Sequence, residues 1–350
     1  MNLFVLSERY PDNTFVGMAV RHTLEEVLAS TCDATFIVPQ ANNKIKFLKR
    51  YRQRLQRSWY SIDGLPTLGP GPNILLAVGL GPSFLLSMFV LDPLLHRFDL
   101  RIGYLLDGFN PQYLDRAVIP HLDHLFVITA EIADRINHQT VPTQFLPLAT
   151  NALDRGCNRA HRCIDIVSYG RRNQDLHRCL QVYYNQTNSE RIYHHSTFLR
   201  PQVEDLGEHI TLLSKFLDRS KVSLCFEASY LERFQGYSPI LLRWFEGWAS
   251  GCNIVGRRPL GQGVAELIDW ENSTLELPEN SADWIFFLEE ILNDKPTLTR
   301  NSQRNYQECL LRHDWRYRVS DLLKTLELPI PENLKFGLTK LKQKLDETTL

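Results

Sequence analysis

The chain has 350 residues, 43% of them hydrophobic and 23% charged, which is enough apolar material for two hydrophobic cores of ordinary size. The formal net charge of −1 excludes a global field that would attract nucleic acid or an anionic surface, so we expect no nucleic-acid partner. The seven cysteines form no C-x-x-C pair and the first residues lack a secretory pattern, which together predict a cytoplasmic protein.

The first half of the chain alternates short apolar runs with amphipathic stretches. Strands are predicted at 3–6, 34–38, 74–78, 101–106, 124–128 and 144–148, with helices at 20–29 and 130–136. The uncharged stretch 64–91 is broken at Gly79-Leu80-Gly81-Pro82, so its apolar runs are too short for a bilayer of roughly 30 Å hydrocarbon. We interpret them as a buried strand followed by a buried helix. This alternation predicts a doubly wound, mostly parallel sheet.

A basic segment runs from Lys44 to Arg57, with seven basic residues and no acidic one. Ile45, Leu48 and Leu55 recur within it at helical spacing, which predicts a basic amphipathic helix. Such a helix docks to an anionic membrane, binds a charged saccharide or forms an ordinary solvated face. Peripheral contact with the inner face of the membrane is therefore one of three interpretations.

The second half repeats the alternation after a polar linker at 151–162. Strands are predicted at 164–168, 192–194 and 222–226, with helices at 175–184 and 209–220. We expect an N-terminal Rossmann-like domain at 1–150 and a second at 160–325. A lysine-rich helical tail at 326–350 follows, containing Lys335, Lys340, Lys342 and Lys344.

The segment 238–256 combines a predicted helix, a turn of small residues and a short apolar strand. Ser238 is the predicted N-cap and the proline after it the first helical residue. Arg243, Glu246 and Ser250 share one helix face, and Gly251 ends the helix before the strand. A helix N-terminus and an arginine favour anionic oxygens, while a carboxylate accepts hydrogen bonds from vicinal hydroxyls. The segment therefore predicts a site for a diphosphate linked to a ribose.

Five sequence strings of the second half occur in a characteristic order. They are S-Y-G-R-R at 168–172 with His177 following, Ser220-Lys221, R-W-F-E-G-W-A-S-G-C-N-I-V-G at 243–256, L-I-D-W at 267–270 and H-D-W-R-Y-R at 313–318. Together they resemble the nucleotide-sugar region of GT-B glycosyltransferases of the group 1 type, most closely the CgeB/YkvP-like branch. The resemblance covers roughly residues 163–320. It implies two Rossmann-like doubly wound domains that face each other across a cleft, with the tail crossing back to the first domain.

The resemblance also implies roles for individual residues on the donor side. Gly170 turns the chain so that Arg171 or Arg172 contacts the donor diphosphate, and a solvated arginine pair is the alternative. Glu246 matches the ribose-binding second glutamate of an E-x7-E motif, whose first glutamate is replaced here by Ser238. Ser220 and Lys221 are expected near the nucleotide, although a lysine at a helix C-terminus also complements the helix dipole.

The acceptor and any catalytic base are expected in the first domain. Asp107 follows a predicted strand directly, where the carboxyl end of the strand faces the cleft, and Glu8, Arg9 and Asp12 follow the first strand in the same way. A carboxylate at such a position is a candidate base, and a turn-forming acid is the alternative. The cysteines and histidines reproduce no zinc spacing, so we predict no metal.

The sequence as a whole predicts a metal-independent glycosyltransferase that uses a nucleotide-diphosphate sugar, needs no cofactor and retains anomeric configuration. Its acceptor is a saccharide, a lipid or a protein. One alternative is a non-catalytic protein of the same fold that binds nucleotides or saccharides, since Ser238 replaces an expected carboxylate. A nicotinamide-dependent oxidoreductase is disfavoured, because no G-x-G-x-x-G string follows a predicted strand.

Overall fold

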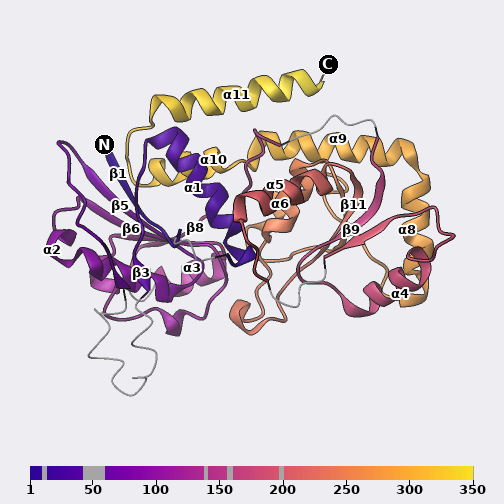
Figure 1. Ribbon diagram of the computed structural model, residues 1–350, viewed down its shortest axis with the longest axis horizontal. Helices are drawn as coiled ribbons and strands as arrows, with labels where there is room; N and C mark the ends of the chain where they lie inside the picture. The colour runs from indigo at the N-terminus through magenta and orange to yellow at the C-terminus, as the bar shows by residue number, and fades with distance from the viewer. Residues whose placement is uncertain (10–13, 42–59, 138–140, 156–160, 197–200, 350) are drawn as a thin grey trace.

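The computed structural model describes residues 1–9, 14–41, 60–137, 141–155, 161–196 and 201–349. It contains a six-stranded and a five-stranded parallel sheet, side by side in two α/β domains (Figure 1). The first sheet uses strands between residues 2 and 145, and the second uses strands between 164 and 276. The predicted fold class, two Rossmann-like doubly wound domains, is confirmed.

The first sheet has the strand order β2-β1-β5-β6-β7-β8. In β1, Leu3 and Val5 pack with helix α1, whereas Phe4 and Leu6 pack with the 3₁₀ helix η5 on the other face. Successive side chains of a strand point to opposite faces, so a sheet covered on both sides is apolar throughout. The elements of this domain are β1 (Asn2–Leu6), η1 (Val16–Met18), α1 (Ala19–Cys32), β2 (Thr35–Ile37), β3 (Gln40–Ala41), β4 (Tyr60–Ser61), β5 (Asn73–Gly79), η5 (Pro82–Leu91), α2 (Asp92–Leu95), β6 (Leu100–Leu105), η6 (Pro111–Tyr113), η7 (Ile119–His121), β7 (His124–Val127), α3 (Ala130–Asn137) and β8 (Thr143–Phe145).

The second sheet has the strand order β10-β9-β11-β12-β13, again with parallel pairing throughout. Its core on one face joins Val222 and Leu224 of β11 to helices α4 and α8. On the other face α6 and α9 cover the sheet with the buried indoles of Trp244 and Trp248. The elements are β9 (Ile164–Ser168), α4 (Gln174–Tyr184), β10 (Tyr193–His195), α5 (Leu206–Leu217), β11 (Ser220–Phe226), η8 (Glu232–Phe234), α6 (Leu242–Ala249), β12 (Asn253–Arg257), α7 (Val264–Leu267), β13 (Leu275–Glu276), η9 (Ser281–Asp283), α8 (Trp284–Asn293) and α9 (Lys295–Arg312).

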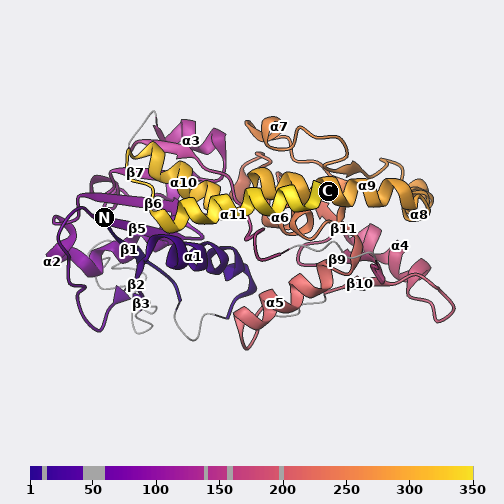
Figure 2. The same cartoon turned by 90° about the horizontal axis from the view of Figure 1, so that it is seen from above.

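The last two helices, α10 (Trp315–Thr325) and α11 (Glu332–Thr349), connect the two domains. The indole of Trp315 in α10 donates a hydrogen bond of 3.0 Å to the hydroxyl of Thr23 in α1. Helix α11 contacts α1 of the first domain and α9 of the second, and it runs across both domains in Figures 1 and 2. Lys344 fastens it by donating hydrogen bonds of 2.6 Å to the carbonyls of Leu153 and Arg155. The chain therefore returns to the first domain after completing the second.

Three predicted helices differ from the observed ones. The predicted buried helix after β5 is the 3₁₀ helix η5, and the helix predicted at 209–220 ends at Leu217, so that Ser220 begins β11. The helix predicted to begin after Ser238 begins at Leu242 instead. The physical reason is that the Ser238 hydroxyl donates to the carboxylate of Glu227 at 3.1 Å, so it does not cap a helix.

Candidate functional site

A cavity of about 480 Å³ lies between the two domains. The first domain lines it with residues that follow β5, β6 and β8, and the second with residues at the ends of β9 and β10. Ligands of open α/β sheets bind outside the carboxyl ends of the strands, and here the carboxyl ends of both sheets meet at one space. This cavity is therefore the candidate ligand site.

The turn after β9 brings Arg171 to the cavity. Gly170 adopts φ +65°, the left-handed region that favours glycine, and its amide donates a 3.1 Å hydrogen bond to the hydroxyl of Ser196. Arg171 is partly buried, and one of its guanidinium nitrogens is buried without a hydrogen-bond partner among the described residues. Burial, followed by repulsion from Arg243, lowers the pKa of Arg171. Such an uncompensated guanidinium is suited to an anionic ligand.

Arg243 reaches the same place from the start of α6. Its guanidinium donates a hydrogen bond to the backbone carbonyl of Arg171, so the two arginines are held together. No side chain caps the N-terminus of α6, and Leu241, Leu242 and Arg243 all line the cavity. Among the described residues, neither Arg171 nor Arg243 forms an ion pair with a carboxylate. Two cations and the start of a helix that no side chain caps among the described residues thus line one part of the cavity.

Glu246 lies one turn further along α6 and is only 4% exposed. The hydroxyl of Tyr169 donates to its Oε2 at 3.0 Å, and Nη2 of Arg155 lies 3.6 Å from its Oε1. Burial raises the pKa of Glu246, while attraction to Arg155 and the Tyr169 hydrogen bond lower it. The carboxylate lines the cavity with part of its hydrogen-bonding capacity unused, because two oxygens offer about four acceptor positions.

Asp107 lies at the cavity on the first-domain side, directly after β6. Its carboxylate accepts a 3.0 Å hydrogen bond from Arg233 of the second domain and another of 2.8 Å from the amide of Gly108. A side chain at Gly108 would overlap the ring of Phe234, so glycine permits the close approach of the two domains here. Asp107 therefore links the domains, in addition to facing the cavity.

Glu8 is the other notable carboxylate of the first domain. It follows β1, and its carboxyl group accepts a hydrogen bond from the amide of Leu80, which lines the cavity. Burial raises the pKa of Glu8 to about 7, against the attraction of Arg21, and the neighbouring Glu25 adds to the increase. Glu8 does not line the cavity, so it is a partly buried acid next to a residue that does.

Several predicted site residues do not line the cavity. Ser220 and Lys221 lie at the amino end of β11, where Lys221 binds Asp165 at 2.6 Å, because the preceding helix ends earlier than predicted. Ser250 and Gly251 lie at the far end of α6, where Gly251 ends the helix with φ +65°. Ser238 is buried against Glu227 and does not line the cavity.

Arg172 does not line the cavity and lies close enough to two histidines to affect their pKa values. Its charge lowers the pKa of His177 and His195, after the larger effect of burial on both. The rings of these histidines lie 4.6 Å apart, and Nδ1 of His177 is 2.9 Å from the hydroxyl of Tyr193. Of the predicted arginine pair, only Arg171 lines the cavity.

Three residues at the site, Tyr169, Arg155 and Arg233, were not predicted from the sequence. Of the three, only Tyr169 could have been predicted from the sequence. It belongs to the S-Y-G-R-R string and directly follows a strand, so it lies at the same carboxyl edge of the sheet as Gly170 and Arg171. Arg155 comes from the linker and Arg233 from η8, and their partners Glu246 and Asp107 are about a hundred residues away in sequence. Only the tertiary structure brings these pairs together.

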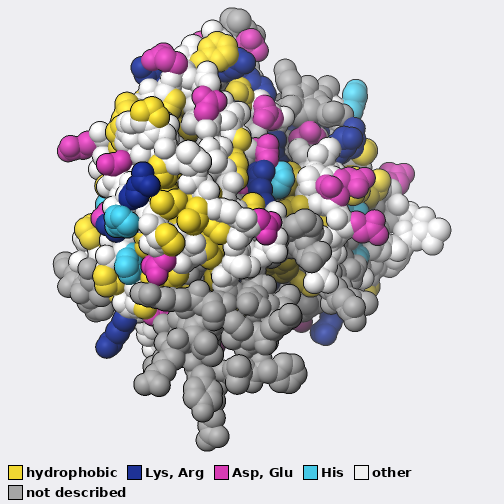
Figure 3. All heavy atoms as spheres, turned by 60° about the vertical axis from the view of Figure 1, so that its left-hand side comes forward, with side chains coloured by type: hydrophobic (Ala, Val, Ile, Leu, Met, Phe, Trp, Pro, Cys, Tyr) yellow, Lys and Arg dark blue, Asp and Glu magenta, His cyan; other side chains and the backbone are white. Residues whose placement is uncertain are grey.

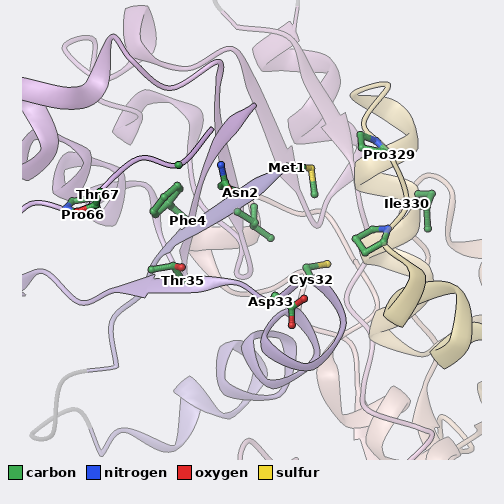
Figure 4. A pocket seen from close by; sticks show the side chains of 13 residues that line it. Met1, Asn2, Phe4, Cys32, Asp33, Thr35, Pro66, Thr67, Pro329 and Ile330 are labelled. Carbon is green, nitrogen blue, oxygen red and sulfur yellow. The ribbon is translucent and has the colours of Figure 1, made fainter. Parts of the chain in front are cut away.

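A second cavity, of about 510 Å³, lies at the amino end of β1, next to the segment that leads into α11 (Figure 4). Among the described residues, Asp33 is the only charged side chain that lines it, and Asn2 is already hydrogen-bonded to Pro70 and Asn73. It lies at the wrong end of the strands for a ligand of this fold and has no converging cations. We do not assign a functional site there.

The surface, the basic segment and the predicted absence of a metal add no further site residues. Side chains of both charges are interspersed with hydrophobic ones on the face shown in Figure 3. The basic segment from Lys44 to Arg57 lies outside the described residues. In the described part of the chain, no helix is long and apolar enough to cross a membrane. The same residues contain no group of three or more side chains arranged to hold a metal ion.

Comparisons with known proteins support the fold. No family model matches the sequence, and no curated protein matches it. The structure is similar to an alpha-glucosyltransferase in complex with UDP-glucose and DNA containing an abasic site, with a TM-score of 0.53 and 9% identity, over 93% of this chain and 99% of that chain. A complex of alpha-glucosyltransferase with UDP and a 13-mer DNA gives a TM-score of 0.51 at 9% identity, over 93% and 100%. The comparison with TarM gives a TM-score of 0.46 at 10% identity and covers 72% of this chain. The match covers 54% of TarM, so this chain spans only about half the length of that protein. The fold is thus that of GT-B glycosyltransferases.

Proposed function

We propose that this protein is a glycosyltransferase that moves a sugar from a nucleoside diphosphate to an acceptor hydroxyl. The observation that carries the proposal is the convergence of Arg171, Arg243 and buried Glu246 in one cavity at the carboxyl ends of both sheets. The arginines and the uncapped start of α6 match a diphosphate, and Glu246 matches the hydroxyls of a ribose. The similarity to structures solved with UDP-glucose and UDP supports a nucleotide sugar as donor.

In the proposed reaction, the acceptor oxygen forms a bond to the anomeric carbon of the sugar. The bond from that carbon to the diphosphate breaks, and its electron pair leaves with the diphosphate. Arg171 and Arg243 stabilise the negative charge that develops on this leaving group, which is the role of preorganised cations in transfer reactions. The acceptor proton passes to the carboxylate of Asp107 and from there to solvent, with Arg233 orienting that carboxylate.

Two finer features belong to the proposal. We expect the reaction to proceed without a metal ion, because the arginines supply the positive charge that the leaving group needs. Turnover that persists in the presence of EDTA supports this, and loss of turnover restored by Mg²⁺ contradicts it. We also expect retention of anomeric configuration, as in the branch that the sequence resembles, which requires the acceptor oxygen to attack the face of the sugar that the diphosphate leaves. Attack on the opposite face, with Asp107 as the base, would invert the configuration instead. The anomeric proton coupling of the product in an NMR spectrum distinguishes the two outcomes.

A ligand screen tests the proposal directly. Thermal unfolding is followed with UDP, GDP, ADP and TDP, and one of them should stabilise the protein, by about 2.7 kcal/mol at a hundredfold excess over its Kd. The matching nucleoside without phosphates is the control, since it lacks the groups that Arg171 and Arg243 are proposed to bind. Equal stabilisation by the nucleoside and the diphosphate would argue against the arginine site. The diphosphate sugar is then assayed for release of the diphosphate.

One alternative function has a specific observation in its favour. Position 238 carries no carboxylate, and the carboxylate of Asp107 is already paired with Arg233. A protein that binds the nucleotide sugar without transferring the sugar is compatible with both facts. Tight binding of the donor without release of diphosphate, across a panel of acceptors, would favour this alternative.

A further inference from the structure

The first domain lines the cavity with an almost wholly apolar wall. Phe15, Val16 and Val20 come from the segment around η1 and the start of α1, and Leu80, Leu106 and Leu148 follow three strands of the sheet. Asp107 is the only charged side chain that the first domain contributes among the described lining residues, and Arg233 already pairs with it. The cations and Glu246 all come from the second domain, so the two walls differ in chemistry.

Helix α5 continues the apolar wall onto the second domain. Leu212, Leu213 and Phe216 line the cavity from α5, which packs against α1 and η1 across the domain boundary. Backbone hydrogen bonds join the segment around η1 to the segment that precedes α5. The amide of Val16 donates to the carbonyl of Pro201 at 2.9 Å, and the amide of Val203 donates to the carbonyl of Thr14 at 3.0 Å. The apolar wall is therefore a fixed feature at the junction of the domains.

Two side chains of this wall are exposed at its rim. Phe15 is 40% exposed and Leu212 is 52% exposed, although both are large and apolar. His209 is the polar exception that α5 contributes to the lining. A saccharide placed against Phe15, Val20 and Leu212 would therefore have most of its hydroxyls removed from water without hydrogen-bonding partners, which is unfavourable. An apolar molecule would instead remove apolar surface from water on both sides of the contact.

We infer that the acceptor is an alcohol carried on an aliphatic or aromatic scaffold, whose apolar body lies between Phe15, Val20 and Leu212. Its hydroxyl extends to the polar end of the cavity, beside Asp107 and the donor site. That this ligand is an acceptor rests on the proposed function, whereas the binding of an apolar alcohol to this wall does not. The sequence allowed a saccharide, a lipid or a protein as the acceptor, and the apolar wall favours an apolar alcohol.

Direct binding tests the inference without a donor. The fluorescence of 2-naphthol is titrated with the wild-type protein, Phe15→Ser and Leu212→Gln. Loss of one apolar contact should raise the Kd roughly tenfold in each variant, the usual scale for a group lost from an apolar pocket. Both residues are half exposed, so the variants are expected to fold, which thermal unfolding checks. The matched controls are Phe286→Ser and Leu311→Gln, whose side chains are 67% and 49% exposed and line neither cavity.

The controls should bind 2-naphthol as the wild type does. An equal Kd in the wild type and in both wall variants would overturn the inference, and so would an absence of binding to the wild type. The affinity for UDP should be unchanged in Phe15→Ser, because that side chain belongs to the opposite wall. If UDP fails to bind the wild-type protein while 2-naphthol binds as described, the proposed function fails and the apolar site stands.

Transfer then distinguishes the kinds of acceptor. With the donor identified in the ligand screen, octan-1-ol, 2-naphthol, maltose and duplex DNA are each offered as acceptors, and products are detected by mass spectrometry. We expect glycosides of one or both apolar alcohols, with the better substrate identifying an aliphatic or an aromatic scaffold. Transfer to maltose or DNA, with none to either alcohol, would overturn the assignment of the acceptor.

Discussion

Replacing Glu246 by glutamine is the sharpest test of the donor site. The amide keeps the volume of the side chain and one acceptor oxygen, so the hydrogen bond of 3.0 Å from Tyr169 can persist. The negative charge is lost, and with it the charge-assisted hydrogen bonds that we propose to two ribose hydroxyls. Hydrogen bonds to charged groups contribute about 1.5–3 kcal/mol each. The loss of one such contribution should weaken UDP binding by about tenfold to a hundredfold.

The same substitution also affects stability. Arg155 and Glu246 are both buried, with side chains 6% and 5% exposed, and their closest atoms lie 3.6 Å apart. Breaking a buried pair usually costs about 3–5 kcal/mol, because the remaining charge stays buried without a partner. We expect a smaller loss than that range, because burial raises the pKa of Glu246 in spite of Arg155, so the ionised carboxylate itself costs stability, and because the amide oxygen of glutamine remains near Arg155.

Acidification should mimic the substitution. Burial raises the pKa of Glu246 above its ordinary value of 4.5, so in the folded protein the carboxylate gains a proton at a higher pH than usual. A protonated carboxyl group accepts hydrogen bonds from the ribose less well. The affinity of the wild type for UDP should therefore fall as the pH is lowered toward that pKa, whereas the Glu246→Gln variant should lack this component of the pH dependence.

Calorimetric titration with UDP at pH 7.5 measures the effect, after circular dichroism and thermal unfolding show that the variant is folded. The control is Glu290→Gln, an exposed glutamate of α8 outside the cavity, which should bind UDP as the wild type does. A folded Glu246→Gln variant with unchanged affinity for UDP would refute the role of Glu246 in the donor site.

Three further predictions concern charge and stability. Arg171→Gln should weaken UDP binding by roughly tenfold or more in calorimetry, because a charged contact to phosphate is lost, while Arg178→Gln, an exposed control on α4, should not. Burial raises the pKa of Glu8 to about 7, so ionisation of Glu8 lowers the stability of the folded protein as the pH rises from 4.5 through 7. Glu8→Gln removes this ionisation. It should add up to about 3 kcal/mol to the free energy of unfolding in urea at pH 8, and much less at pH 5. An equal gain at both pH values would contradict that reasoning. Lys344→Met should lower the free energy of unfolding by about 1–3 kcal/mol through the loss of two hydrogen bonds, against little change for the exposed control Lys342→Met.

Much of the site followed from local sequence patterns. Apolar runs located every strand of the first sheet and all of the second except the edge strand β13. Residues directly after a strand in a parallel sheet must lie at its carboxyl edge. Gly170, Arg171 and Asp107 were identified in this way and line the cavity. The spacing of Arg243 and Glu246 on one helix placed both at the same cavity, because positions three apart share a helix face.

Other predictions failed at the ends of helices. The helix predicted to reach Ser220 ends at Leu217, and this difference of three residues moves Ser220 and Lys221 to the amino edge of the sheet. Ser238 has the residue type and the following proline of an N-cap, yet its hydroxyl binds Glu227, eleven residues earlier in the chain. A tertiary hydrogen bond of this kind competes with the local cap, and the sequence carries no sign of it.

The sequence by itself determined the fold class and the edges of the sheets that hold the candidate site, and it named the arginine and the glutamate that we propose for the donor side. These depend on periodicity and on the direction of parallel strands, which are properties of neighbouring residues. Only the tertiary structure decided which partners those residues have. Arg155 beside Glu246, Arg233 beside Asp107 and the apolar wall around Phe15 arise from the packing of two domains against each other. Contacts between residues so far apart in the chain depend on how the domains dock, which no local pattern encodes.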